Sequence, residues 1–196
     1  MRMNKGLLIV ISGPSGVGKG TVLKKVFEKD DNLVYSVSCT TRPPRSGETD
    51  GIEYHFISKE QFLDNIEKNK MLEYAVYCDN YYGTSAEYVE TLRNAGKDVV
   101  LEIEVQGALQ IKDKCPESVM IFIAPPSIKE LESRLAGRGT ETEDVVNLRI
   151  ARARDEISYI DKYTYCVVNN TVEKACDDIL SVLNAERIKN NKVKIF

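Results

Sequence analysis

The chain has 196 residues, of which 42% are hydrophobic, and a net charge of −3. This length is typical of a single domain with a sizeable core, and the negative charge argues against a general binder of nucleic acid or of lipid surfaces. No apolar run reaches membrane-spanning length and no segment has the pattern of a secretory signal, so we expect a cytoplasmic protein without a membrane partner. Five cysteines without a Cys-x-x-Cys pair predict reduced thiols.

The first predicted element is a short buried strand over residues 7–11, followed by Gly-Pro-Ser-Gly-Val-Gly-Lys-Gly-Thr at 13–21 and a helix-like stretch. Glycines let successive N–H groups point at an anion, the helix adds its positive N-terminal end, and Lys19 supplies a cation for the outer phosphates. The alternative is a plain Gly-rich turn. Because Lys19 stands at the required place, we predict a polyphosphate-binding loop (P-loop).

Residues 39–83 are rich in Pro, Gly, Thr and Tyr, and they predict an excursion inserted into the fold. Arg42 and Arg45 are held three apart by prolines, which favours a stiff pair of guanidinium groups for bidentate phosphate capture. Tyr54 and Tyr82 offer phenolic hydroxyls in the same segment. The alternatives are a solvated charged loop and tyrosines that only pack, but a P-loop needs an acceptor for its phosphoryl group.

Several helix starts carry the Ser/Thr-x-x-Glu/Gln box that satisfies exposed N–H groups. These pairs are Ser58 with Gln61, Thr84 with Glu87, Ser127 with Glu130, and Thr140 with Glu143. A last helix is predicted to begin near Thr171. The polar stretch 137–144 is typical of a mobile flap.

Strand-like stretches at 98–105, 119–124 and 165–168 alternate with helical ones, which predicts a parallel sheet flanked by helices. On one strand Glu102 and Glu104 would share a face, and this pair needs magnesium or a base N–H donor if it is buried. The alternative is a solvent-exposed face on an edge strand. Glu73 is a third acidic candidate.

Arginines form a second cationic group after residue 130. Arg134 and Arg138 lie four apart and would reach one phosphate together if the helix continues. Several arginines around a phosphoryl group can stabilise its charge during the transfer, without a protein nucleophile. The alternative is a set of surface salt bridges to Glu130, Glu132, Glu141 and Glu143, and we assign Arg152 and Arg154 to it.

Six motifs occur in one order along the chain, and together they resemble the guanylate kinase family over essentially its full length. The motifs are Gly-Pro-Ser-Gly-x-Gly-Lys at 13–19, Ser-x-Ser-x-Thr-Thr-Arg-x-Pro-Arg-x-Gly-Glu at 36–48, Gly-x-x-Tyr-x-Phe at 51–56, Asn-Tyr-Tyr-Gly at 80–83, Val-Gln-Gly at 105–107 and Arg-Leu-x-Gly-Arg-Gly at 134–139. The second motif is far more specific than the P-loop.

The resemblance implies an α/β fold: a P-loop parallel sheet flanked by helices, with an inserted mixed α/β GMP-binding region and a helical lid. It implies one domain over 1–196, made of a core (1–37, 91–133 and 156–196), a GMP-binding insertion (38–90) and a lid (134–155). The implied activity is ATP-dependent phosphorylation of GMP to GDP by direct in-line transfer in purine nucleotide metabolism. The implied partners are ATP and GMP, with Mg²⁺ as Mg-ATP, and the chain would be a monomer or a homodimer.

The same resemblance implies roles for individual residues. The implied ATP ligands are Gly13, Pro14, Ser15, Gly16, Val17, Gly18, Lys19, Gly20, Thr21, Arg134, Arg138 and Asn169. The implied GMP ligands are Ser38, Arg42, Arg45, Tyr54, Glu73, Tyr82, Thr84, Glu102, Glu104, Arg138 and Arg149. Charge in the transition state would be carried by Lys19, Arg42, Arg134, Arg138 and Arg149, and magnesium would be held by Thr21 and Glu102, directly or through water.

The chain departs from a common family version at three positions: Thr84 replaces serine, Glu104 replaces aspartate, and Gly20 replaces serine. The last change leaves open which hydroxyl contacts magnesium. Two other functions compete with this interpretation. One is a guanylate-kinase-like module that binds phosphorylated peptides, and the other is a nucleoside monophosphate kinase with a different base preference.

Overall fold

A five-stranded sheet forms the core of the chain, which a computed structural model describes over residues 5–136 and 143–189. The strand order is β2-β7-β1-β8-β9, and every neighbouring pair is parallel. The strands are β1 (Leu8–Ser12), β2 (Leu33–Tyr35), β7 (Asp98–Glu102), β8 (Val119–Ala124) and β9 (Tyr165–Val168). The parallel sheet is confirmed, and β8 and β9 have the predicted bounds. The strand predicted over 98–105 is wrong at its end, because β7 ends at Glu102.

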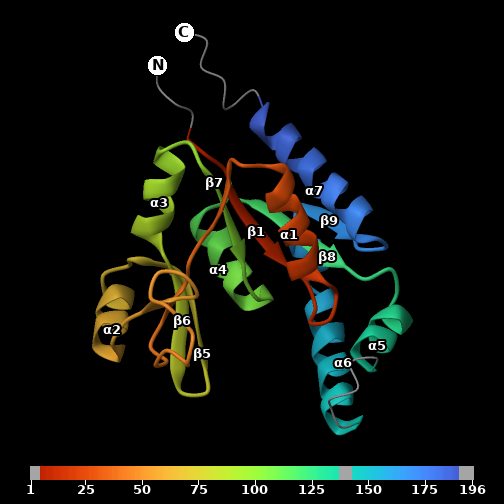
Figure 1. Ribbon diagram of the computed structural model, residues 1–196, viewed down its shortest axis with the longest axis horizontal. Helices are drawn as coiled ribbons and strands as arrows, with labels where there is room; N and C mark the ends of the chain where they lie inside the picture. The colour runs from red at the N-terminus through yellow and green to blue at the C-terminus, as the bar shows by residue number, and fades with distance from the viewer. Residues whose placement is uncertain (1–4, 137–142, 190–196) are drawn as a thin grey trace.

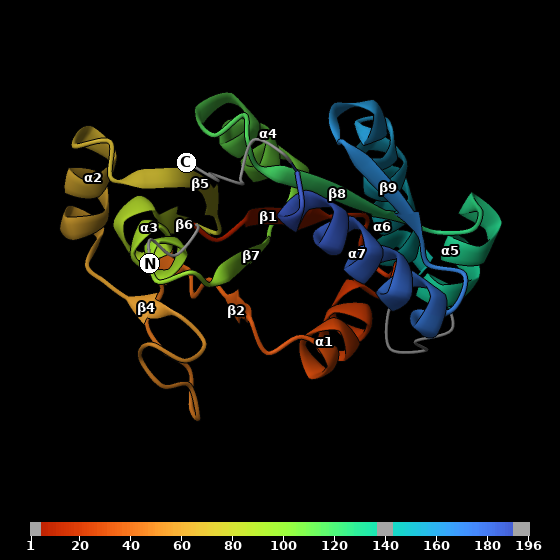
Figure 2. The same cartoon turned by 90° about the horizontal axis from the view of Figure 1, so that it is seen from above.

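Helices cover both faces of this sheet, and every residue of its central strand β1 is therefore buried. Ile9 and Ile11 pack with α1 (Lys19–Lys29) and α7 (Val172–Arg187), whereas Leu8 and Val10 pack with α3 (Ala86–Asn94) and α4 (Val105–Lys114). Figure 2 shows α1 and α4 on opposite sides of the sheet. The predicted α/β class is therefore confirmed, with the P-loop following the central strand.

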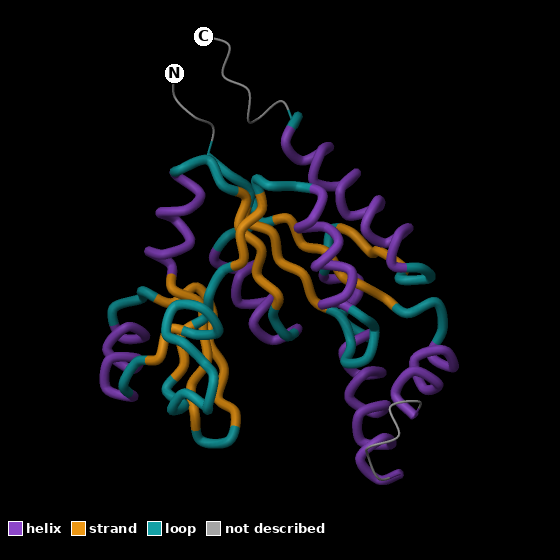
Figure 3. The backbone as a smooth tube through the Cα atoms, in the orientation of Figure 1, coloured by secondary structure: helices purple, strands orange, loops and turns teal. Residues whose placement is uncertain are grey.

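A second, four-stranded sheet stands beside the core, with the order β4-β3-β6-β5. Its strands are β3 (Cys39–Thr40), β4 (His55–Phe56), β5 (Met71–Tyr77) and β6 (Asn80–Ser85), and α2 (Lys59–Glu67) packs on it through Phe62. One pair is parallel and two are antiparallel. Figure 3 shows this sheet as a body separate from the core strands.

The helices α5 (Ile128–Ala136) and α6 (Glu143–Ile157) pack together on the other side of the molecule, and a short 3₁₀ turn, η1 (Ile160–Lys162), precedes β9. In Figure 1 this pair and the β5–β6 hairpin extend from the same end of the core, on opposite sides of it. The carboxyl end of β1 opens between them. Within the described ranges, no helix has both the length and the apolar character needed to cross a membrane.

Most predicted helix starts are confirmed, and one is wrong. Ser58 and Gln61 form a complete capping box, and the Ser127 hydroxyl accepts a hydrogen bond from the Glu130 N–H. Thr171 caps α7. The helix predicted to start at Thr84 starts one residue later, because the Ser85 side chain makes the cap. The Thr140 box lies outside the described residues, as does most of the predicted flap.

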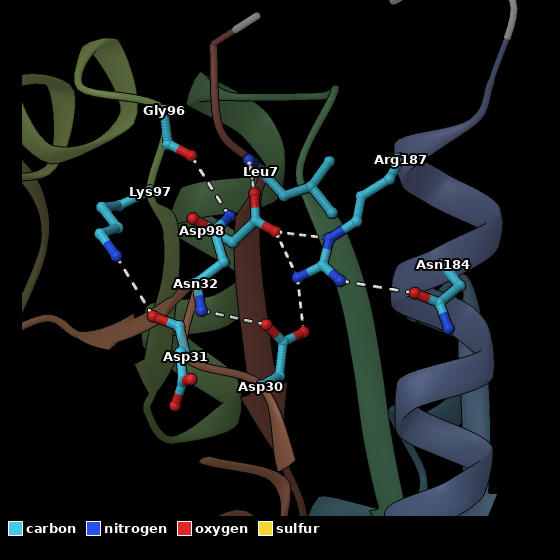
Figure 4. Close-up of polar contacts among 9 residues, drawn as sticks. All are labelled: Leu7, Asp30, Asp31, Asn32, Gly96, Lys97, Asp98, Asn184 and Arg187. Carbon is cyan, nitrogen blue, oxygen red and sulfur yellow. Dashed lines mark hydrogen bonds and ion pairs between the residues drawn. The ribbon is translucent and has the colours of Figure 1, made fainter. Parts of the chain in front are cut away.

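An ionic cluster joins the last helix to the amino end of the core sheet (Figure 4). Arg187 on α7 donates to Asp98 and to Asp30, in both cases at 2.7 Å. Asp98 is 3% exposed and also accepts from the Leu7 N–H at 2.6 Å. The guanidinium thus compensates a buried carboxylate and holds α7 against β1 and β7.

Candidate active site

The loop between β1 and α1 has the curled backbone that the glycines predict. Gly16 has φ +83° and Gly18, the N-cap of α1, has φ +92°, a region that side chains with a Cβ rarely adopt. At Gly16 a Cβ would also lie 2.6 Å from Leu135 on α5. The loop is therefore tightly packed from behind and presents its N–H groups at the start of a helix.

Lys19 folds back over this loop. Its ammonium donates to the Gly13 carbonyl at 2.6 Å and approaches the Pro14 carbonyl at 3.4 Å. Burial lowers the pKa of Lys19, while the carboxylates of Glu102, Glu156 and Glu104 act in the opposite direction. A lysine ammonium at the mouth of an anion site is suited to neutralise an outer phosphate.

Two of the predicted lid arginines reach the P-loop. Arg134 on α5 donates to the Asn169 carbonyl at 3.3 Å and approaches the Val17 carbonyl at 3.5 Å, and it also pairs with Glu130. Arg149 on α6 donates to the Ser15 hydroxyl at 2.7 Å. Arg138 lies outside the described residues. The predicted salt-bridge role of Arg154 is confirmed by its 2.9 Å contact with Glu132.

Asn169 lies under the loop rather than in the solvent. Its side chain is 4% exposed, and its amide donates to the Val17 carbonyl at 2.8 Å. The amide nitrogen lies so close to Gly18 that a Cβ there would be 2.9 Å from it. Asn169 thus supports the P-loop from the end of β9.

Glu48 organises the predicted pair of phosphate-binding arginines, Arg42 and Arg45. The sequence alone assigns no role to this glutamate. Its carboxylate accepts from the Arg42 guanidinium at 2.8 Å and from the Arg45 backbone N–H at 2.7 Å. The Arg42 guanidinium also lies 5.6 Å from the ring centroid of Tyr54, which packs edge-on against Tyr82. Glu48 fixes Arg42 beside both phenols, whereas the Arg45 side chain is exposed.

Six of the predicted GMP ligands line one cleft of about 330 Å³ between the insertion and the carboxyl end of β7. They are Ser38, Tyr54, Glu73, Tyr82, Glu102 and Glu104. Polar groups converge there from both sheets, which is typical of a ligand site at the carboxyl edge of a parallel sheet.

Glu73 is the most buried acid of this cleft, at 5% exposure. Burial raises its pKa, whereas the hydrogen bond from Thr84 and the charge of Lys114 lower it. The Thr84 hydroxyl donates to Glu73 Oε1 at 2.7 Å. This contact explains why Thr84 does not cap α3: its hydroxyl is already used on the neighbouring strand.

Glu102 and Glu104 do not share a strand face as predicted. Glu102 is the last residue of β7, while Glu104 has left the strand and stands at the N-cap of α4, without a capping hydrogen bond. The alternative of an edge strand is also wrong, because β7 lies between β2 and β1. Both carboxylates are nevertheless exposed to the cleft.

The donor set near Lys19 is compatible with Mg²⁺. This ion prefers oxygen ligands and usually binds one or two carboxylates together with substrate phosphates and water. Glu102 is an exposed carboxylate close enough to Lys19 to oppose the lowering of the Lys19 pKa by burial, and Thr21 offers an exposed hydroxyl on the first turn of α1. A Cβ at Gly20 would meet nothing within 4 Å, so a serine there would fit. In the part of the chain that the structure describes, this site included, no group of three or more His, Cys, Asp or Glu side chains is placed to hold a metal ion.

Sequence reasoning missed two further residues near the site. Glu156 on α6 accepts a hydrogen bond from the Ser15 N–H, and its charge partly opposes the lowering of the Lys19 pKa by burial. Gln110 on α4 bonds the backbone of Tyr74, next to Glu73. Glu156 lies seven residues after Arg149, so helical spacing alone would have placed it on the same face.

Comparisons with known proteins agree with this geometry. A family model described as guanylate kinase matches residues 5–186. A guanylate kinase of Halalkalibacterium halodurans is 53% identical over 193 residues, covering 98% of this chain and 95% of that protein. The crystal structure of guanylate kinase from Anaplasma phagocytophilum matches with a TM-score of 0.74 and 35% identity, over 98% of this chain and 92% of that one.

A fragment of tight junction protein 3 containing SH3 and kinase regions matches with a TM-score of 0.51 over 96% of this chain and 61% of that one. At 8% identity this likeness is one of fold alone. The family model, in contrast, matches residues 5–186, and the relative from Halalkalibacterium halodurans is 53% identical. The chain therefore belongs to the guanylate kinase family.

Proposed function

We propose that the chain transfers the γ-phosphoryl group of ATP to GMP, giving ADP and GDP, with the donor on the P-loop and the acceptor in the cleft beside it. The observation that carries this proposal is the buried Glu73 carboxylate, held by Thr84 in a cleft continuous with Glu102 and Glu104. Guanine presents N1–H and N2–H₂ donors that a carboxylate accepts, whereas adenine lacks this donor edge.

The chemistry follows from positioning and charge. The P-loop N–H groups and Lys19 hold the outer phosphates of ATP, and Arg42 with Tyr54 and Tyr82 holds the phosphate of GMP. Transfer is in line between the two nucleotides, without a covalent intermediate on the protein. Arg134 and Arg149 stabilise the charge that develops on the transferred group, because both already lie at the P-loop. Arg138 has the same proposed role from outside the described residues.

We propose Glu102 and Thr21 as the residues that would hold Mg²⁺ at the P-loop, directly or through water. When bound, the ion would neutralise charge on the donor phosphates. The remaining assignments are Arg45 and Ser38 on the acceptor side and Asn169 on the donor side. The insertion (38–90) and the lid (134–155) would close on the core (1–37, 91–133 and 156–196) when both nucleotides bind.

The test is a coupled assay of ADP release with GMP or AMP as acceptor. We expect turnover with GMP, much less with AMP, and loss of turnover in Lys19→Met while the fold is retained. A preference for AMP would overturn the guanine assignment. Retention of GMP turnover in Lys19→Met would overturn the proposed role of the P-loop lysine.

A further inference from the structure

The strand that carries Glu73 lies at the edge of its sheet and is irregular. β5 is the last strand in the order β4-β3-β6-β5, and its pairing with β6 shifts register between Met71 and Glu73. An edge strand has a row of backbone groups without a strand partner. A bulge also loosens the ladder locally. The position of the Glu73 carboxylate therefore depends on what holds β5 from its open side.

Helix α4 provides this support. The Gln110 carboxamide accepts from the Tyr74 N–H at 3.2 Å and donates to the Tyr74 carbonyl at 3.0 Å. One turn later, the Lys114 ammonium donates to the Met71 carbonyl at 2.9 Å. Positions 107, 110 and 114 follow one face of a helix. The amide of Gln110 thus replaces a neighbouring strand at the residue that follows Glu73.

The same helix face limits where the carboxylate can go. A Cβ at Gly107 would lie 2.7 Å from Glu73 Oε2, so this oxygen packs against the first turn of α4. Oε1 is held by Thr84 on β6. Glu73 is therefore fixed between a strand and a helix, and Gln110 sets the distance between the two at the adjacent backbone.

We propose that Gln110 is a positioning residue for base recognition: through both backbone polar groups of Tyr74 it fixes β5 on α4, so that Glu73 meets the donor edge of the acceptor base. The inference rests on the proposed function, in which Glu73 accepts from guanine. The two guanine donors proposed to bind the Glu73 carboxylate require its correct orientation as well as contact. A shift of this carboxylate by about 1 Å would therefore weaken binding strongly.

The experiment replaces Gln110 by Met, which has similar length and helix propensity but neither a strong donor nor a strong acceptor. We expect the KM for GMP to rise about tenfold, while the KM for ATP and kcat at saturating GMP change less than about twofold. Lys112→Met is the matched control, because it removes a bond from the same helix to the Lys162 carbonyl and does not reach β5. Gln110→Asn keeps the amide but is too short to bond both groups, and should give a smaller rise.

A double-mutant cycle separates positioning from general loss of structure. If Gln110 acts through Glu73, then Gln110→Met adds little to the GMP KM of Glu73→Gln. Multiplication of the two effects would overturn the inference, as would an unchanged GMP KM in both folded Gln110 variants. Either result would leave the proposed function standing. Wild-type preference for AMP would instead overturn the function, and the inference with it.

Discussion

At Glu73 two requirements oppose each other. The proposed recognition of guanine N–H groups needs the ionised carboxylate, but burial raises the pKa of this group and disfavours its charge. The Thr84 hydroxyl and Lys114 offset part of this cost. In the proposed function, an ionised Glu73 in the unliganded protein would be a buried charge whose partner is the substrate, so stability would be lowered at the site where specificity arises.

We expect Glu73→Gln to raise the KM for GMP about 30-fold, because the amide N–H₂ group would face a guanine donor. The KM for ATP should not change.

The folded pKa of Glu73 lies above its ordinary value of 4.5. The contribution of this carboxyl group to stability is therefore fully present below that value and is lost as pH rises through the folded pKa. Glu73→Gln should therefore raise the thermal midpoint of the unliganded protein at pH 7.

This gain should disappear below about pH 4, where the wild-type carboxyl is protonated as well. Scanning calorimetry of both proteins across this range gives the comparison. A gain that is constant with pH would mean that the glutamine packs better, not that a charge was removed.

The residues that sequence could identify are those placed in compact motifs. Lys19 and Arg42 have neighbours that predict their chemistry, whereas the role of Glu73 is implied only by the family resemblance. Gln110 and Glu156 act through contacts with Tyr74 and Ser15, which are distant in the chain, and a lone Gln or Glu on a helix usually faces solvent. Their roles could not be predicted until the helices were placed.

Among the elements, α6 contacts the P-loop through two side chains. Arg149 bonds the Ser15 hydroxyl, and Glu156, two turns later, accepts from the Ser15 N–H. Glu156 Oε2 is buried and has no hydrogen-bond partner in the described structure. Because Glu156 occupies the Ser15 N–H and its charge acts on Lys19, we expect it to compete with an incoming phosphate for both groups.

Glu156→Gln keeps an acceptor for Ser15 but removes this charge. We expect a nonhydrolysable ATP analogue to bind about threefold more tightly, since one negative charge near the polyphosphate is gone. Titration calorimetry measures the affinity. Asp155→Asn, which changes the same charge at an exposed neighbouring position, should have no effect. Equal effects of the two variants, or weaker binding to Glu156→Gln, would refute the competition.

Element boundaries were predictable where one signal dominated. β8 is apolar throughout and has the predicted ends, and Ser58 caps α2 with the complete box. The alternation of apolar and acidic residues predicts that Glu104 lies on a strand. The backbone instead turns after Glu102 to begin α4. Alternation over so few residues cannot distinguish a strand end from a helix start.

For the whole molecule, the class of fold follows from alternating strands and helices, but the order β2-β7-β1-β8-β9 does not. That order depends on pairings such as Leu8 with Val99, far apart in the chain. It also depends on the cluster of Arg187, Asp30 and Asp98, which no local pattern reveals. A glycine-rich loop that ends in a lysine predicts chemistry from a few adjacent residues, whereas strand order is a property of the packed chain.

We expect Arg187→Met to lower the free energy of unfolding by about 3 kcal/mol, because Asp98 would stay buried without its cation. Urea denaturation measures the change. Lys174→Met removes an exposed pair with Asp178 on the same helix and should leave the midpoint nearly unchanged. Similar losses in both variants would show that Arg187 acts as an ordinary surface charge.

This cluster also has a consequence for biosynthesis. Asp98 and Arg187 are 89 residues apart, so a ribosome takes on the order of ten seconds to make the second after the first. During that interval β1 and β7 can already pair, with the Leu7 N–H on a carboxylate that still lacks its guanidinium. The strand that carries the phosphate loop is thus among the first parts synthesised, whereas the guanidinium that compensates the buried Asp98 beside it comes only with the last helix.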